Sequence, residues 1–312
     1  MRRVATALLL AAFAAPATAG LALVGNEEGG TISLIDTTRD EVVGEIRTGG
    51  KPRGTAIDAK RGIAYVSDQP NNALLVIDLE KRAVARRIDL GESPEGVYLS
   101  PDGRLVAAAV ELTNSVVFID TATEAVVFKV KIKGENPEHA VFSPDGRFVY
   151  VSAEEDDKLE VIDVAARSLV AQLKVGTRPR GIAFTPDGAK AYVACERADT
   201  VYVIDARAHQ ILRTIKAGLR SNGLAMHPDG KRVYLSNGGD ANVMVIDTAA
   251  DAVLATIPVG KRPWNMALTR DGAKLYVANG RSNSVTVIDT VKLSVVREIA
   301  VGNSPWGVHI LD

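Results

Sequence analysis

Short runs of apolar and β-branched residues alternate with turn-forming residues along most of the chain. In one representative stretch the runs cover 181–185, 191–194, 200–205 and 210–215, with Pro186-Asp187-Gly188 after the first. Such runs, separated by turn signals, are typical of short β-strands. Pro-Asp-Gly suits a tight turn because proline presets φ, aspartate bonds back to turn amides and glycine accepts a left-handed conformation. The pattern predicts a four-stranded antiparallel meander.

The meander recurs at a nearly fixed period. Each third strand ends in two apolar residues and an aspartate, such as Val76-Ile77-Asp78, and five of the six intervals between these aspartates are 42 residues. The seven aspartates are Asp36, Asp78, Asp120, Asp163, Asp205, Asp247 and Asp289. A Gly-x-x-Pro turn recurs with the same period, with Ser221 in place of proline once. Self-similarity at this period indicates one supersecondary unit used seven times.

The third strands are almost continuously apolar, which requires that each sheet be covered on both faces. Stacking the units as blades around an axis provides that cover for every unit. We expect the repeated aspartates to accept backbone amides in the turns that follow them. We also expect the tyrosines of the second strands to pack between blades; they are Tyr65, Tyr150, Tyr192, Tyr234 and Tyr276.

The two ends of the repeat region each supply part of one unit. Residues 21–24 align with a second strand, whereas residues 307–311 align with a first strand. Joined, they complete a blade, so no long sheet edge is left exposed where the ring closes. The sequence therefore predicts an all-β, seven-bladed β-propeller with four-stranded antiparallel blades, closed by pairing of the C-terminal strand with the N-terminal blade.

Residues 1–19 differ in character from everything that follows. Arg2 and Arg3 precede an apolar run of small residues, and Ala17-Thr18-Ala19 forms an A-x-A signal before Gly20. This pattern is typical of a secretory signal peptide cleaved after Ala19. We therefore expect residues 20–312 to form a single domain that is exported to the periplasm and does not span the membrane.

Composition excludes several classes of function. Lys and Arg total 37 against 38 Asp and Glu, so no large net field recruits nucleic acid or an anionic membrane. Cys195 is the single cysteine, so a disulfide within the chain is excluded, and no Cys-x-x-Cys-His motif for covalent haem is present. By its position between the second and third runs of its repeat, Cys195 is expected in a loop with its thiol nearly exposed.

Two four-residue stretches carry a family resemblance. Tyr276-Val277-Ala278-Asn279 and Tyr192-Val193-Ala194-Cys195 are each followed by a Val-Ile-Asp strand. Together with the Gly-x-x-Pro turns, they resemble the YVTN family of bacterial β-propeller repeats. With its export signal and seven repeats, the chain is similar to the PQQ-dependent catabolism-associated β-propeller proteins. That resemblance implies an association with periplasmic alcohol oxidation that depends on pyrroloquinoline quinone (PQQ), and it implies no molecular activity.

Function is best sought where the register is kept but the residue type changes. The residue after each Gly-x-x-Pro turn is expected near the channel mouth, on the first strand of its blade. These residues, which we call the mouth ring, are Arg53, Glu95, Glu138, Arg180, Asn222, Trp264 and Trp306, and Asn265 lies beside Trp264. The tryptophans could offer an aromatic wall to a flat ligand and the arginines could bind carboxylates or phosphates. Alternatively, the arginines and glutamates pair with one another and the tryptophans cap the blades.

His139 replaces the glycine that follows the mouth ring in most repeats, next to Glu138. With Glu95 these residues could bind a divalent cation or act as acid and base. His309 stands where other repeats carry small residues, so it points towards the channel or fills a gap. The acidic run 154–157 is expected to be a solvated loop on the same face, with calcium binding as the alternative.

These features favour a non-catalytic binding or interaction protein, accessory to a PQQ-dependent alcohol oxidation system. The partner would be a quinoprotein dehydrogenase or another periplasmic protein, with a small ligand at the mouth, and PQQ or calcium as the possible cofactors. The first alternative is an enzyme, such as a lactone hydrolase or a quinone-linked redox subunit. The second is binding of single-stranded nucleic acid, for which aromatic platforms beside arginines are suitable, although the near-zero net charge and the export signal count against it.

Overall fold

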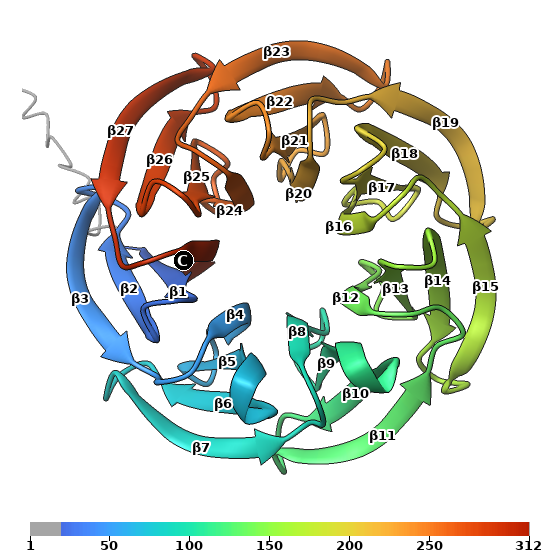
Figure 1. Ribbon diagram of the computed structural model, residues 1–312, viewed down its shortest axis with the longest axis horizontal. Coiled ribbons are helices and arrows are strands. Elements are labelled where there is room, and N and C mark those ends of the chain that lie inside the picture. The colour runs from blue at the N-terminus through green and yellow to red at the C-terminus, as the bar shows by residue number, and fades with distance from the viewer. Residues whose placement is uncertain (1–19, 312) are drawn as a thin grey trace, which may run out of the picture.

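The computed structural model describes residues 20–311, which form seven four-stranded antiparallel sheets arranged as blades around a central axis (Figure 1). The expected signal peptide, residues 1–19, lies outside the described residues. Blade 1 contains β28 (Pro305–Leu311), β1 (Leu21–Asn26), β2 (Thr31–Asp36) and β3 (Glu41–Arg47). Blade 2 contains β4 (Pro52–Asp58), β5 (Ile63–Asp68), β6 (Ala73–Asp78) and β7 (Ala83–Asp89), with the short 3-10 helix η1 (Gln69–Asn71) after β5. Blade 3 contains β8 (Pro94–Leu99), β9 (Leu105–Val110), β10 (Ser115–Asp120) and β11 (Ala125–Lys131), with η2 (Glu111–Thr113) after β9.

The remaining four blades repeat the same order from the axis outwards (Figure 1). Blade 4 contains β12 (Pro137–Phe142), β13 (Phe148–Ala153), β14 (Lys158–Asp163) and β15 (Ser168–Lys174). Blade 5 contains β16 (Pro179–Phe184), β17 (Lys190–Cys195), β18 (Thr200–Asp205) and β19 (Gln210–Lys216). Blade 6 contains β20 (Ser221–Met226), β21 (Arg232–Asn237), β22 (Asn242–Asp247) and β23 (Ala252–Pro258). Blade 7 contains β24 (Pro263–Leu268), β25 (Lys274–Asn279), β26 (Ser284–Asp289) and β27 (Ser294–Ala300).

The ring closes within blade 1, as the sequence predicts. The last strand, β28, pairs antiparallel with β1, so that Leu21 faces Leu311 and Val24 faces Val308. The N-terminal and C-terminal segments therefore share one sheet, and blade 1 has four strands like the other blades. This arrangement leaves no unpaired first strand at the point of closure.

The repeated side chains hold the blades together as expected. Asp247 accepts hydrogen bonds from the backbone amides of Ala249 and Ala250, and the other six repeat aspartates accept turn amides in the same way. The second-strand tyrosines are fully buried between blades. The Tyr192 hydroxyl, for example, donates to the Asp251 carboxylate of the next blade at 2.6 Å. Turn chemistry thus fixes each blade internally, while the tyrosines link neighbouring blades.

The two faces of the disc differ. The face that we call the far face carries the turns between first and second strands and between third and fourth strands, including the Pro-Asp-Gly turns. The opposite face, the mouth face, carries the loops between second and third strands and the links from each fourth strand to the next first strand. Residues that vary from blade to blade gather on the mouth face, so this face is the place to examine for a functional site.

Candidate functional site

A repeated irregularity at the start of each first strand positions the mouth ring. In blade 2, Pro52 pairs with Asp68 and the next paired residue is Thr55, so Arg53 and Gly54 fall outside the ladder. A shift occurs at the same place in every other first strand; in β12 and β28 it leaves out only one residue, Glu138 or Trp306, because His139 and Gly307 rejoin the ladder. Neighbouring first strands approach closely here, since a Cβ at Gly54 would clash with the Glu95 carbonyl oxygen. The bulge therefore re-aims the residue after proline.

One cluster of mouth-ring charges joins blades 1 to 3. The Arg53 guanidinium donates to Glu95, and its second amino group lies 2.8 Å from a carboxylate oxygen of Glu27. The Gln69 amide also donates to Glu95, at 2.7 Å. Glu95 is 1% exposed, so this contact is shielded from water. Arg53 is thus held by carboxylates from the blades on either side of its own.

A second, larger cluster joins blades 4, 5 and 7. Arg180 lies 2.5 Å from Glu138, 3.1 Å from Glu154 and 3.0 Å from Glu196. Arg178 also pairs with Glu154 and Glu196, and Arg262 reaches Glu196 at 2.7 Å. All three glutamates in the cluster are buried. The arginines and glutamates of the mouth ring therefore pair with one another, as the second of the two sequence hypotheses proposes.

Burial and mutual repulsion set the ionisation of these carboxyls. Burial, reinforced by the Glu138 charge, raises the pKa of Glu95 above its ordinary value. The same two causes raise the pKa of Glu154. Burial acts to raise the pKa of Glu138 and Glu196 as well, but Arg180 and the other positive charges around them together outweigh it and lower the pKa of both. The cluster thus holds some carboxyls that are ionised and others that are poised to bind a proton near neutrality.

Trp306 of the mouth ring meets His139 across the axis. The His139 and Trp306 rings, from blades 4 and 1, stack with centroids 5.9 Å apart and an interplanar angle of 28°. The Tyr98 hydroxyl lies 2.5 Å from Nδ1 of His139. Trp306 is 7% exposed and His139 is 2% exposed, so this stack fills the channel below the mouth. Burial lowers the pKa of His139 to about 4, which keeps the imidazole neutral at pH 7.

The remaining predicted residues lie on blades 6 and 7. The Asn265 amide donates to the Trp306 carbonyl at 3.4 Å. Trp264 is half-buried, and the Arg262 guanidinium lies 5.9 Å from the centre of its ring. Asn222 is buried. The structure therefore brings all nine predicted site residues to the inner end of the mouth face, but it leaves Trp264 as the aromatic residue of the ring with substantial exposure.

One sequence expectation on this face holds only in part, and a second is wrong. Residues 154–157 form a turn in which Glu155 is exposed, but Glu154 is buried and pairs with Arg178 and Arg180. Cys195 is not near the surface, because β17 extends through it and its side chain is fully buried. That burial raises the pKa of the Cys195 thiol to about 12. Cys195 is the last residue of β17 and Glu154 comes immediately after β13, so both side chains lie inside the disc.

The sequence patterns did not lead us to predict four residues of the charge network. They are Glu27, Arg178, Glu196 and Arg262, and all four follow the repeat register. The residue immediately after each second strand is Glu27, Gln69, Glu111, Glu154, Glu196, Gly238 and Gly280 in turn. Four of these seven residues are glutamates. The repeat register alone could therefore have predicted a second ring of acidic side chains that pair with the arginines next to the first-strand prolines.

The described part of the chain offers no assembled metal centre. Among residues 20–311, no group of three or more His, Cys, Asp and Glu side chains is arranged to hold a metal ion. Glu138 is paired with Arg180, and Nδ1 of His139 is engaged with Tyr98. The hypothesis of a divalent cation on Glu95, Glu138 and His139, and that of calcium on the 154–157 run, gain no support from this geometry.

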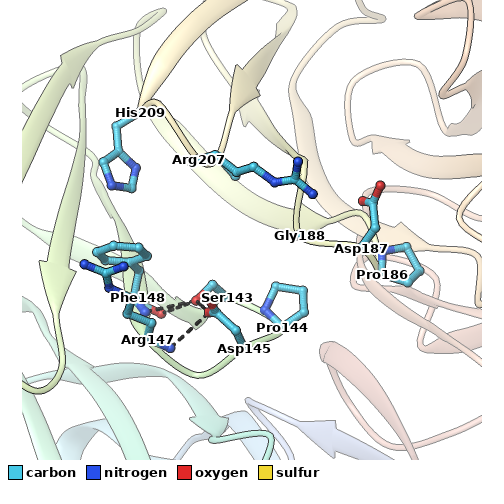
Figure 2. A pocket seen from close by; sticks show the side chains of 11 residues that line it. Ser143, Pro144, Asp145, Arg147, Phe148, Pro186, Asp187, Gly188, Arg207 and His209 are labelled. Carbon is cyan, nitrogen blue, oxygen red and sulfur yellow. Dashed lines mark hydrogen bonds between the residues drawn. The ribbon is translucent and has the colours of Figure 1, made fainter.

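A separate pocket of about 560 Å³ opens on the far face, between the Pro-Asp-Gly turns of blades 4 and 5 (Figure 2). The Arg147 guanidinium lies 4.7 Å from the centre of the Phe148 ring, and His209 meets the edge of the same ring. Arg207 extends across the pocket towards Asp187 (Figure 2). Because Asp145 and Asp187 balance the two arginines, the pocket has little net charge with which to select an ion.

Comparison with known proteins places the chain by its fold. The sequence profile of the YNCE-like β-propellers matches residues 99–312. None of the curated proteins matches the sequence. Hydrazine synthase of Kuenenia stuttgartiensis is similar in structure, with a TM-score of 0.79 and 23% identity over 86% of this chain and 92% of that one. A functionally unknown protein from Desulfotomaculum acetoxidans DSM 771 has a TM-score of 0.82 and 18% identity, over 93% of this chain and 98% of that one.

These structural similarities establish the fold alone. No helix within residues 20–311 has the length and apolar character needed to cross a membrane.

Proposed function

The chain belongs to the YNCE-like β-propeller family, and from that premise we propose that it is an exported binding protein of the periplasm. Its mouth face would hold a partner protein of a PQQ-dependent alcohol oxidation system, the quinoprotein dehydrogenase itself being the first candidate. The resemblance of its repeats to the PQQ-associated propellers supports this assignment. So does the uneven distribution of variable residues, which gather on one face of an otherwise repetitive disc.

The observation that carries the proposal is the buried network of Arg53, Arg178, Arg180 and Arg262 with their glutamates. Apolar side chains of similar volume would stabilise a propeller at least as well as buried ion pairs. A network of this kind instead fixes backbone loops in one arrangement, which lowers the entropy lost when a partner binds. The mouth face is thus a rigid platform, and its exposed edges are available for contact.

Two exposed apolar residues rise from this platform. Leu112, in η2 of blade 3, is 63% exposed, and Leu219, between β19 and β20, is 55% exposed. Exposed leucines on rigid loops, surrounded by charged groups, have the composition expected of the centre and rim of a protein interface. The half-buried Trp264 lies on the same face. A small ligand held at Trp264 would be the alternative occupant.

The paired charges argue against the two other functions. Arg53 is paired with Glu27 and Arg180 with Glu138, so they are not available to bind phosphates of a nucleic acid or carboxylates of PQQ. Glu138 has a lowered pKa and stays ionised, which does not suit a proton donor. Nδ1 of His139 is bound by Tyr98. Binding through exposed loops remains the function that this arrangement supports best.

The test measures binding of the mature chain, residues 20–312, to the host's purified quinoprotein alcohol dehydrogenase by biolayer interferometry. Leu219→Asp and Leu112→Asp should each weaken binding about tenfold, because a charge replaces an apolar contact. The matched control is Val291→Asp, on the far face, where valine is 80% exposed. Absence of binding, or equal weakening by all three variants, would refute the proposal. N-terminal sequencing of the periplasmic protein should begin at Gly20.

A further inference from the structure

Another cavity opens on the far face beside the axis, and its walls break the repeat. It measures about 330 Å³ and lies between β4, β8, β24 and β28. Four positions after the first-strand proline, blades 2 and 7 carry Ala56 and Ala267, whereas blades 3 and 1 carry Tyr98 and His309. Two polar aromatic side chains therefore project from positions where most blades have alanine.

The cavity has the form of an apolar funnel with a polar end. Its outer wall is aliphatic, with Ile57, Leu99, Leu268 and Ile310 at the far ends of the four strands. Tyr98 and His309 lie deeper, one residue nearer the mouth on β8 and β28. Beyond them the His139–Trp306 stack spans the channel, so the funnel is open towards the far face and filled towards the mouth. Apolar walls with a few convergent polar groups are characteristic of small-molecule sites.

Two buried imidazole nitrogens in this part of the channel have no hydrogen-bond partner among the described residues. One is Nε2 of His309, which lines the cavity, and the other is Nε2 of His139, which lies outside the lining. Burial, and to a smaller extent the nearby His139, lowers the pKa of His309. A buried polar atom without a partner is costly, and a native structure rarely retains one without a use. The nitrogens therefore offer hydrogen bonds that a bound molecule could complete.

The charge of the surroundings selects the kind of molecule. Burial keeps both imidazoles neutral, so neither attracts an anionic head group strongly. A hydroxyl can donate or accept, so it matches Nε2 of a neutral histidine in either tautomer. The aliphatic wall suits a hydrocarbon chain, and the volume corresponds to about ten water-sized atoms.

We propose that the axial funnel binds a small aliphatic alcohol, with its chain against β4, β8, β24 and β28 and its hydroxyl hydrogen-bonded to His309. This site is at the opposite end of the channel from the partner-binding face, and it does not depend on the partner assignment. The alcohol enters from the far face and stops below the His139–Trp306 stack. Only hydrogen bonds and apolar contacts hold it, so binding is reversible and involves no chemical step.

The test is titration calorimetry of the mature protein with hexanol, using hexanoate as the anionic analogue. Hexanol should bind with one-site saturation, and hexanoate should bind about tenfold more weakly because it carries a charge into an apolar site. His309→Phe retains the volume of the ring but removes the nitrogen, and it should weaken hexanol binding about tenfold. Ala267→Phe should abolish binding by filling the funnel. His209→Phe, outside the channel, is the matched control and should leave binding unchanged.

Circular dichroism checks that each variant is folded. A loss of hexanol binding in a folded variant then reports on the funnel and not on unfolding. Absence of saturable hexanol binding to the wild-type protein would overturn the proposal. Unchanged affinity in both His309→Phe and Ala267→Phe would do the same, since the ligand would then lie elsewhere. Hexanoate binding as tightly as hexanol would overturn the choice of a neutral head group. The Leu219→Asp assay addresses the mouth face alone, so failure of one proposal leaves the other measurable.

Discussion

Replacing Glu95 by glutamine should change how the stability of the propeller depends on pH. Glu95 is 1% exposed, and burial together with the Glu138 charge raises its pKa from 4.5 to about 8, against the attraction of Arg53. Between these two values the folded chain holds a proton that the unfolded chain releases. Glu95 therefore stabilises the fold at acid pH, and that contribution is lost as the pH rises through about 8.

The interval from pH 6.5 to 8 isolates this effect. One pKa unit corresponds to about 1.4 kcal/mol, so the loss attributable to Glu95 across this interval is about 2 kcal/mol. His139 and His309 act in the opposite direction, because their pKa values fall from 6.5 to about 4 in the folded state. At pH 6.5 each unfolded histidine is half protonated, so together they cost the fold about 0.8 kcal/mol there, and this cost is relieved as the pH rises to 8. Glu154, with a pKa raised to about 7, adds a smaller loss in the same interval.

The assay is thermal unfolding followed by circular dichroism at pH 6.5 and pH 8. The wild-type protein should melt about 4 °C lower at pH 8, and Glu95→Gln should remove most of that difference. Glutamine keeps an oxygen that can accept from Arg53, so the variant should fold normally. Glu92→Gln, at an exposed position in the preceding turn, is the matched control and should respond to pH as the wild type does. An identical pH response in Glu95→Gln and the wild type would show that Glu95 is not protonated in the folded state.

Three further predictions concern the fold. Deleting residues 305–312 removes β28 and leaves blade 1 with three strands, so it should prevent soluble folding; a truncated chain that melts like the intact protein would refute closure through this strand. Tyr192→Phe removes the hydrogen bond to Asp251 and should lower the free energy of unfolding by about 1–2 kcal/mol, as measured by denaturant titration. No change would mean that this bond between blades contributes nothing to stability. Cys195, buried and with its thiol pKa raised to about 12, should react with a thiol reagent only after the protein unfolds, and stoichiometric labelling of the native chain would contradict its placement in β17.

The repeat register was sufficient to predict the fold, because each turn aspartate and each interblade tyrosine follows from contacts within one period. Closure of the ring also followed from the register, since residues 21–24 and 307–311 align with neighbouring strands of one unit. The mouth-ring residues were placed correctly on one face. Their pairing was left open between two hypotheses, since the distance between charges on different blades depends on how tightly the first strands approach.

Contacts between distant blades were beyond the reach of the sequence. His139 meets Trp306 because blades 4 and 1 face each other across a narrow axis, and the repeat period carries no information about that separation. The burial of Glu154 likewise depends on Arg178 and Arg180 in the next blade. The prediction for Cys195 was wrong because a small side chain at the boundary does not show whether its position is the last of the strand or the first of the loop.

The most direct test of the central claim is site-specific photocrosslinking in the native host. A benzoylphenylalanine introduced at Leu219 or Leu112 should give a crosslinked product on the mouth face, and mass spectrometry should identify the quinoprotein dehydrogenase in it. The same probe at Val291, which is 80% exposed on the far face, should give no such product. A dehydrogenase crosslinked from Val291 but from neither leucine would contradict the assignment of the mouth face as the binding surface.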